Sequence, residues 1–306
     1  MPDVNSKFEG YADDFKIGYD LALQQKTSRF RDKVKWANAV KGEGAQIVDH
    51  ILPFEAEVGG DDFADTKWTH PEMMPRWAFP ISLTVSVPVT TTDRLSMLAD
   101  PSNDLTASII AAQNRALDGK IIVPAFFRDV TGGKDKDKTL SFDASQIIGK
   151  DIGSANSGIN RDKIDAAIEL FETNEVDLDE EMPWMAITPR QHRLLRNLAE
   201  VKNRDFDKLG GVMKDGKVTQ FLGCNVFVSN RLIKIKIGAV TYVRMPIWVP
   251  SGMAVQPWLE PKVRISERPD KNYTTQLWCQ SRFGAIRTEE GRVIEVLCNE
   301  EALPAA

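Results

Sequence analysis

The residue pattern that comes nearest to a ligand-binding motif is a glycine and lysine segment in the second half of the chain. Residues 211–217 read GVMKDGK, which matches GxxxxGK, the first part of a phosphate-binding loop. The next residue is Val218, so the hydroxyl that would hold Mg²⁺ is missing. Such a loop also needs a strand before it and a helix after it, whereas here a helical pattern leads into a strand pattern. The sequence therefore argues against nucleotide binding.

The residue types that hold metals or carry out catalysis are scattered. His50, His70 and His192 have no second ligand at helical spacing. The acidic run 175–181, EVDLDEE, lacks the glycine and the ligand spacing of a Ca²⁺-binding loop, so a solvated surface explains it better. No GxSxG or HExxH motif occurs. We therefore expect no catalytic residue, no metal site and no cofactor, and we expect that the protein is not an enzyme.

Composition and charge narrow the class of protein further. The chain has 306 residues, of which 42% are hydrophobic and 27% charged, which is typical of a globular protein with a real core. Lys and Arg total 39 against 44 Asp and Glu, so the net charge of -5 argues against a protein whose main task is to grip nucleic acid. The three cysteines, without CxxC spacing, predict buried thiols and a reducing compartment. No apolar run predicts a membrane span, so we expect a protein made in the cytoplasm.

The strongest structural pattern lies in residues 77–90, WAFPISLTVSVPVT. Every odd position from Trp77 to Val89 is apolar and every even position is small or polar, which predicts an unusually long β-strand with one apolar face. Pro80 and Pro88 cannot donate ladder hydrogen bonds, so the strand must lie at a sheet edge or be unpaired at those points.

Residues 44–58 are the expected partner of this strand, and a polar tip separates the two. We expect a protruding β-arm at 41–90. A two-stranded hairpin is marginal alone in water, so its apolar face must find cover. That cover is either the chain's own domain or a neighbouring subunit.

Aromatic residues at spacings of three and four predict a helix near the N-terminus. They are Phe8, Tyr11, Phe15 and Tyr19. This helix docks either on its own core or on a neighbour.

The rest of the chain mixes helices and strands, which indicates an α+β fold. Residues 100–119 predict a long helix that Gly119 stops, and 120–127, KIIVPAFF, predict a short buried strand. Helices expected to begin after Asn160 and at Pro189 alternate with strands at 182–188, 218–229 and 239–249, as in a compact α/β unit. The end of the chain predicts a hairpin turned at Glu289–Gly291.

The order of these elements resembles the major capsid proteins of tailed double-stranded DNA bacteriophages, whose shared architecture is the Johnson fold of the Hong Kong 97 phage type. The likeness is clearest in PWMAITPRQHRLLRNLAEV and the following RDFDKLGGVMKDGKVTQFLGCNVFVSNRL. Further matches are VPSGMAVQPWLEPKVRISERPDKNYTTQLWCQSRFGAIRTEEGRVIEV and DPSNDLTASIIAAQNRALDGKII. The resemblance covers about residues 40–300 and depends on the order of the motifs.

The resemblance implies a domain plan. Residues 1–40 would be the N-terminal arm and 41–92 the extended β-hairpin loop. The peripheral domain would comprise 93–154, with its spine helix at 100–119, and would be completed by 251–306. The axial α/β domain would be 155–250.

The resemblance also implies a function. Such subunits self-assemble as hexamers and pentamers into an icosahedral shell around double-stranded DNA in the virion. Scaffolding, portal and decoration proteins would be partners, the DNA would make weak non-specific contacts, and no membrane would be involved. An encapsulin-type nanocompartment shell and a soluble α/β enzyme remain as alternatives. The residues expected at subunit contacts are Phe8, Tyr11, Phe15, Tyr19, Trp68, Trp77, Phe79, Ile81, Leu83 and Val85.

Overall fold

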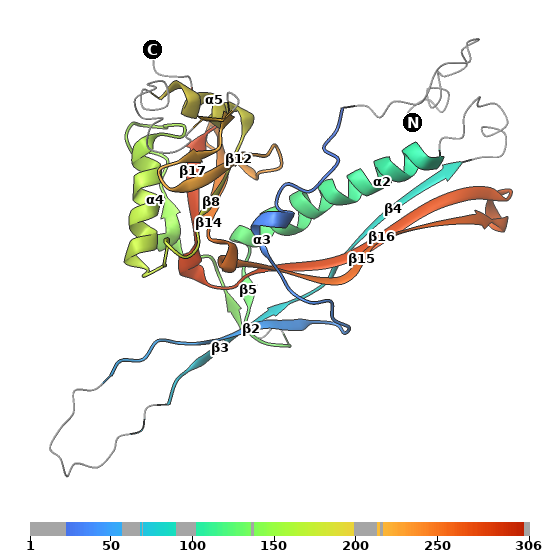
Figure 1. Ribbon diagram of the computed structural model, residues 1–306, viewed down its shortest axis with the longest axis horizontal. Coiled ribbons are helices and arrows are strands. Elements are labelled where there is room, and N and C mark those ends of the chain that lie inside the picture. The colour runs from blue at the N-terminus through green and yellow to red at the C-terminus, as the bar shows by residue number, and fades with distance from the viewer. Residues whose placement is uncertain are drawn as a thin grey trace.

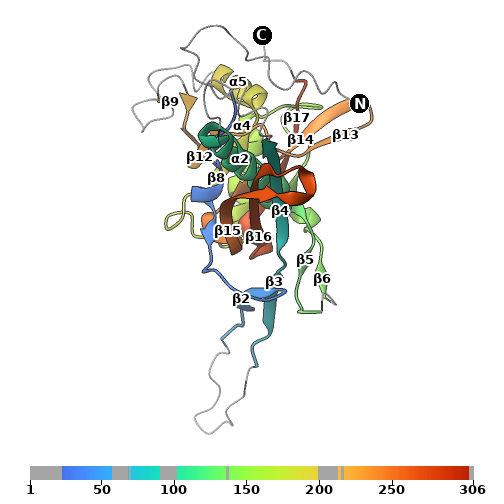
Figure 2. The ribbon, with the colours of Figure 1, turned by 90° about the vertical axis from the view of Figure 1, so that its right-hand side faces the viewer.

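The computed structural model describes residues 23–56, 68, 70–89, 102–135, 138–198, 213–214 and 217–302. Two β-sheets and a long helix form the body, and a two-stranded arm projects from it (Figures 1 and 2). Among the described residues, no helix is both long enough and apolar enough to cross a bilayer.

The first sheet is long and narrow. Its four strands run in the order β1 (Lys35–Trp36), β15 (Met253–Arg268), β16 (Thr274–Arg287) and β4 (Ile81–Val89). The hairpin of β15 and β16 turns at η7 (Pro269–Lys271), and Asn272 after it adopts a left-handed φ of 51°. β4 pairs only with β16 and is an edge strand, as Pro88 within it requires.

The long helix runs along the length of this sheet (Figure 1). It consists of α2 (Ser102–Ala116), a π-helical segment η3 (Leu117–Ile122) and α3 (Val123–Phe127), which follow one another without a break. The predictions that Gly119 stops the helix and that 120–127 form a strand are therefore wrong. The apolar run is buried on all sides, and burial of a helix produces the same continuous apolar sequence as burial of a strand.

The π-helical segment has a local cause. Pro124 has no backbone N–H and crowds the carbonyl four residues earlier, which disfavours a regular α-helical turn there. The backbone N–H of Val123 donates instead to the carbonyl of Asp118, five residues back. The helix thus continues through the proline with one widened turn.

The second sheet forms the compact α/β unit. Its strands run in the order β11 (Gln220–Phe221), β12 (Cys224–Val228), β8 (Trp184–Ile187), β14 (Val240–Trp248), β17 (Val293–Asn299) and β7 (Ile147–Ile148), with β13 (Lys234–Ile237) also paired to β14. The predicted helices are confirmed as α4 (Arg161–Thr173), capped by Asn160, and α5 (Pro189–Asn197), capped by Thr188. The capping side chains accept from Lys163 N and Gln191 N.

The hairpin predicted at Glu289–Gly291 is wrong. β16 belongs to the first sheet and β17 to the second, and the short helix η8 (Glu290–Arg292) connects them. The C-terminal strand 293–299 therefore completes the α/β unit, not the sheet that carries the long helix.

The arm is a separate antiparallel pair. β2 (Ala45–Ile51) pairs with β3 (Met73–Ala78), which also touches β5 (Val130–Thr131) and through it β6 (Thr139–Leu140). The single strand predicted over 77–90 is two strands in two sheets. The chain changes sheet at Phe79–Pro80, because proline cannot continue the ladder of β3.

An aromatic cluster joins the long helix to the α/β unit. The ring of Phe126 in α3 lies 4.6 Å from that of Trp248 in β14, between ring centroids. Phe30 stacks on Trp248 and also contacts Phe126, and the indole N–H of Trp248 donates to the carbonyl of Lys33 at 2.8 Å. The chain entering from the N-terminus is thus fixed at this junction by a buried indole with its polar atom satisfied. The remaining short helices are η2 (Arg31–Lys33), η4 (Ala144–Gln146) and η6 (Pro250–Gly252).

Candidate assembly surfaces

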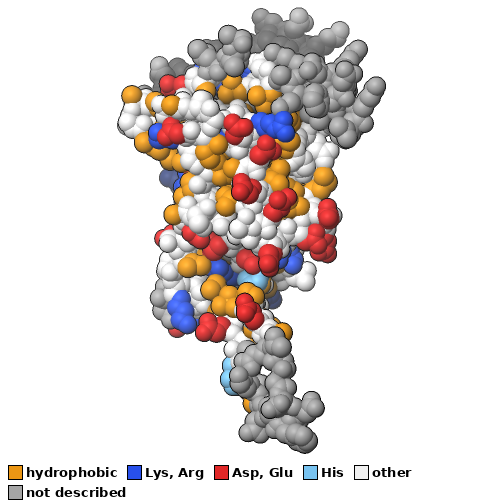
Figure 3. All heavy atoms as spheres, turned by 90° about the vertical axis from the view of Figure 1, so that its left-hand side faces the viewer, with side chains coloured by type: hydrophobic (Ala, Val, Ile, Leu, Met, Phe, Trp, Pro, Cys, Tyr) orange, Lys and Arg blue, Asp and Glu red, His pale blue; other side chains and the backbone are white. Residues whose placement is uncertain are grey.

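The outer half of the arm exposes large apolar side chains. Ile51 and Met73 face each other across the last paired positions and are 59% and 63% exposed. Phe54 and Trp68, farther along the arm, are 63% and 85% exposed. Figure 3 views the molecule from the side of α4 and the arm, with hydrophobic side chains in orange. The described part of the subunit therefore leaves this apolar surface uncovered.

The root of the arm is held by a buried cluster of charges. Arg76 of β3 and Arg287 of β16 are almost fully buried and both contact Glu290. Arg287 also donates to the carbonyls of Phe126 and Arg128, at 2.7 and 3.1 Å. Burial lowers the pKa of Arg76 from its usual value. One carboxylate thus links the arm, the end of β16 and the end of the long helix.

A cavity of 360 Å³ lies beside this root. Trp77, Phe79 and Ile81 line one side of it, and Arg128 and Ile286 line the other. All three of the predicted contact residues here are half-buried. They keep apolar surface available at the point where the arm leaves the body.

Leu83 and Val85 are placed differently from this expectation. Both are among the residues expected at subunit contacts. From Leu83 onward the structure covers the apolar face of β4 with the chain's own helix α2, because β4 lies in the first sheet. Leu83 is buried, and Val85 packs with Leu105 and Ile109 of α2. Phe8, Tyr11, Phe15 and Tyr19 lie outside the described residues.

The structure also places the residues considered above as candidates for nucleotide or metal binding. The glycine–lysine motif itself contains strand β9 (Met213–Lys214), which pairs with β10 (Lys217–Val218), so a strand stands where a phosphate-binding loop needs a helix. His192 Nε2 accepts from Val218 N at 3.2 Å, while His70 is exposed. Across the described part of the chain, no group of His, Cys, Asp or Glu could hold a metal.

The cysteines and the acidic run have structural explanations. Cys224, Cys279 and Cys298 are all free and buried, as predicted, and burial raises the pKa of Cys224 and of Cys298 to about 12. Asp177 accepts from the backbone N–H groups of Asp179 and Glu180, which forms a local turn. Sequence reasoning missed Arg76 and Glu290, because nothing in the sequence brings β3 next to the start of η8.

Comparison with known proteins identifies the class of protein that uses this fold. The capsid of cyanophage P-SCSP1u is 16% identical with a TM-score of 0.70, over 92% of this chain and 91% of that one. The capsid of Ralstonia phage GP4 is 12% identical with a TM-score of 0.71, over 95% and 96%. The capsid of cyanophage Pam1 is 11% identical with a TM-score of 0.70, over 99% and 100%. The fold is therefore that of phage capsid subunits, a mixed α+β fold with a long helix.

A sequence-family comparison gives the membership. The family described as phage capsid protein matches residues 8–300, and the chain belongs to that family. It is a structural protein of the virion and not an enzyme. No curated protein sequence matches this chain.

Proposed function

We propose that the chain assembles as hexamers and pentamers into a closed icosahedral shell around phage double-stranded DNA. The observation that supports this best is the arm, which carries four uncovered apolar side chains away from the body. Each such side chain contributes roughly 1.5–3 kcal/mol when fully buried. In a closed assembly the same surface is satisfied repeatedly by symmetry, so one arm per subunit provides one contact per subunit.

The domain plan is proposed in a form adjusted to the structure. The extended loop comprises the outer part of the arm between β2 and β3. The peripheral domain comprises the first sheet with the long helix, and the axial domain comprises the second sheet with α4 and α5. Strands β7 and β17 then belong to the axial domain. The N-terminal arm, with its four aromatic residues, is proposed to contact a neighbouring subunit.

The proposed contact residues fall into two groups. Trp68 on the arm and Trp77, Phe79 and Ile81 at its root are proposed to contact a neighbour directly. Leu83 and Val85 support the strand from inside, where α2 covers them. Scaffolding, portal and decoration proteins are proposed as further partners.

The direct test removes the outer part of the arm and keeps the hydrogen-bonded pairing of β2 with β3. Deleting residues 53–71 and joining Leu52 to Glu72 through Asn-Gly preserves the last rung, in which Leu52 N donates to Glu72 O at 2.9 Å. We expect a folded subunit that no longer forms shells in negative-stain micrographs. Shells of normal size and yield from the deletion would contradict the proposal.

A point variant provides the matched comparison. Phe54→Ser with Trp68→Ser should reduce shell yield, whereas Met182→Ser, on the exposed loop before β8, should not. Circular dichroism spectra should be the same for all three proteins. Equal loss of shells in both variants would indicate general loss of apolar surface and would contradict a specific role of the arm.

The alternative function is an encapsulin-type compartment, which uses the same kind of shell around enzymes. The similar structures described above are phage capsids, which favours the phage shell. Particles purified from the native source distinguish the two functions. DNA-filled heads support the phage shell, and particles filled with enzyme cargo contradict it.

A further inference from the structure

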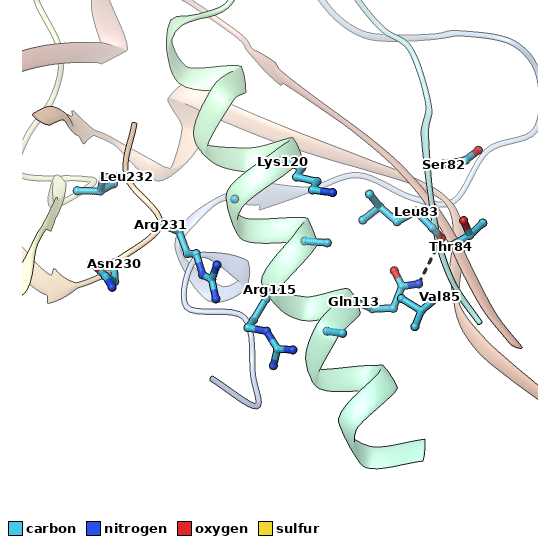
Figure 4. A pocket seen from close by; sticks show the side chains of 13 residues that line it. Ser82, Leu83, Thr84, Val85, Gln113, Arg115, Lys120, Asn230, Arg231 and Leu232 are labelled. Atoms are coloured by element: carbon cyan, nitrogen blue, oxygen red, sulfur yellow. Dashed lines mark hydrogen bonds between the residues drawn. The ribbon is translucent and has the colours of Figure 1, made fainter. Parts of the chain in front are cut away.

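A cleft of 730 Å³ lies where β4, the long helix and the loop after β12 meet (Figure 4). Its helix side is formed by Ala112, Ala116 and Gly119, which recur on one face of the helix at spacings of four and three. None of these residues has a side chain beyond Cβ. The helix backbone is therefore close to the surface of the cleft, and larger side chains surround it.

The side chains around the cleft are basic. Arg115, Lys120 and Arg231 line it, and no Asp or Glu does, although the whole chain has a net charge of -5. The stem of Arg231 lies against the helix, with its Cδ 3.7 Å from the place where a Cβ on Gly119 would be. Lys120 and Arg231 are exposed, and neither forms an ion pair with a described residue. The positive charge of the cleft is therefore not neutralised within this part of the subunit.

The acid nearest to Lys120 along the helix does not line the cleft. Asp118 is fully buried, and its carboxylate accepts from the side chains of Gln25 and Ser28 and from the backbone N–H of Arg29. The segment that holds Asp118 adds further cations. Lys26 has an exposed side chain, and its carbonyl accepts from Asn114 of the helix at 2.9 Å. Arg115, which lines the cleft, donates to the side chain of Gln24 and to the carbonyl of Gln25, so this segment borders the cleft.

The polarity of the exposed lining shows which kind of ligand fits. Leu83 and Leu232, the largest apolar residues of the lining, are only 8% and 6% exposed because they belong to the core. The lining residues that solvent reaches are the cations, Asn230, the hydroxyl-bearing Ser82 and Thr84 and, in part, Val85, Ala112 and Ala116. The apolar part of this surface therefore consists of small side chains and one valine, without a large apolar side chain that could anchor a peptide. The polar part offers charged and hydroxyl donors, which are the groups that bind phosphate oxygens.

We propose that this cleft binds backbone phosphates of the DNA inside the shell and is a defined contact between the subunit and its contents. The proposal rests on the proposed shell function for the identity of the polyanion and for the orientation of the cleft toward the interior. The few cations involved give weak binding without sequence preference, because phosphate contacts carry no base information. Such binding suits a container that must later release its DNA.

The test measures how the affinity for DNA depends on salt. The full-length protein, as unassembled capsomers, is titrated with a labelled 30-base-pair duplex of random sequence at several salt concentrations. Each phosphate contact contributes about 0.9 to the slope of log K against log salt. Lys120→Gln with Arg231→Gln should therefore lower the slope by about 2. Both side chains are exposed, so the fold is expected to tolerate the changes.

The matched control removes two exposed cations elsewhere, through Lys236→Gln on β13 and Lys262→Gln on β15. We expect its slope to equal that of the wild type. An unchanged slope in the cleft variant, or an equal fall in the control, overturns the proposal. Shell assembly is scored in the same preparations. The two proposals can fail separately. If the wild-type protein never assembles, but the cleft variant still lowers the salt slope of DNA binding, the shell function is refuted and the cleft is supported as a DNA-binding site.

Discussion

The Nη2 atom of Arg76 lies 3.2 Å from Oε1 of Glu290, so the root of the arm is tied to the segment that connects the two sheets. Glu290 also contacts Arg287, whose side chain is fully buried. The carboxylate thus offsets two buried guanidinium groups at once. This arrangement ties β3 to the connection between β16 and β17.

The first prediction concerns this buried cluster, in which one carboxylate contacts two guanidinium groups. Glu290→Gln leaves two buried cations without a counter-charge and should lower the free energy of unfolding by about 3 kcal/mol or more. Arg76→Met removes one cation and leaves the pair of Arg287 and Glu290 intact, so its loss should be clearly smaller. Urea unfolding of the unassembled subunit measures both. Arg268→Met, in an exposed pair with Asp270, is the control and should show no measurable change. Equal losses for Glu290→Gln and Arg76→Met would contradict this account.

The second prediction concerns the contact between the long helix and the first sheet. Gln113 is buried, accepts from the hydroxyl of Ser281 at 2.8 Å and donates to the carbonyls of Leu83 and Cys279 at 3.3 and 3.4 Å. Gln113→Leu leaves these groups unpaired and should cost about 1–3 kcal/mol of unfolding free energy. Adding Ser281→Ala removes one unpaired group, so the double variant should cost less than the sum of the single variants. Strict additivity in urea unfolding would show that the hydrogen bond contributes nothing.

The third prediction uses two glycines whose surroundings differ. A Cβ at Gly119 would make only ordinary contacts with Arg231, at 3.7 and 3.8 Å, and the backbone there is helical. Gly119→Ala should therefore raise the free energy of unfolding by about 0.5–1 kcal/mol. A Cβ at Gly284 would lie 2.7 Å from the carbonyl oxygen of Phe79. Gly284→Ala should destabilise the subunit and loosen the arm root, which hydrogen exchange in β3 would report. The opposite order of stabilities in thermal unfolding would refute the prediction.

Gly119 also shows where sequence reasoning reaches its limit. A glycine followed by an apolar run is typical of a helix end and a buried strand. Here the run is buried on every side, so neither periodicity nor propensity distinguishes helix from strand. By contrast, the alternation in β4, the cap at Asn160 and the helix start at Pro189 are local signals, and the structure confirms them. The partners of a strand depend on segments far apart in the sequence.

For the candidate assembly surfaces too, local patterns are predictable from the sequence and contacts between distant segments are not. The alternation correctly predicts which residues of 81–89 share a face, but it cannot tell whether that face meets the chain's own helix or another subunit. Phe79–Pro80 could have been identified as a break, because proline interrupts a ladder. The contact between Arg76 and Glu290 could not, because the two residues are 214 positions apart in the sequence, as the difference of their numbers shows.

The last prediction is a pH dependence carried by His192. This side chain is buried between α5 and β10, where its Nε2 accepts from Val218 N. Burial lowers the pKa of His192, and the charges of Arg196 and Lys217 lower it further. The unfolded chain therefore binds a proton at higher pH than the folded chain does. The free energy of unfolding then falls as the pH drops below about 6.5, the ordinary pKa of histidine, until the folded pKa is reached.

His192→Gln retains a side-chain acceptor for Val218 N and removes the titrating group. Urea unfolding of both proteins between about pH 7.5 and pH 5 measures the difference, since most carboxylates titrate below this window. The wild type should lose more stability than the variant as the pH falls, because only the wild type must take up a proton at this site on unfolding. Parallel curves for the two proteins would show that the histidine titrates alike in the folded and unfolded chains, and that the hydrogen bond from Val218 does not hold it neutral.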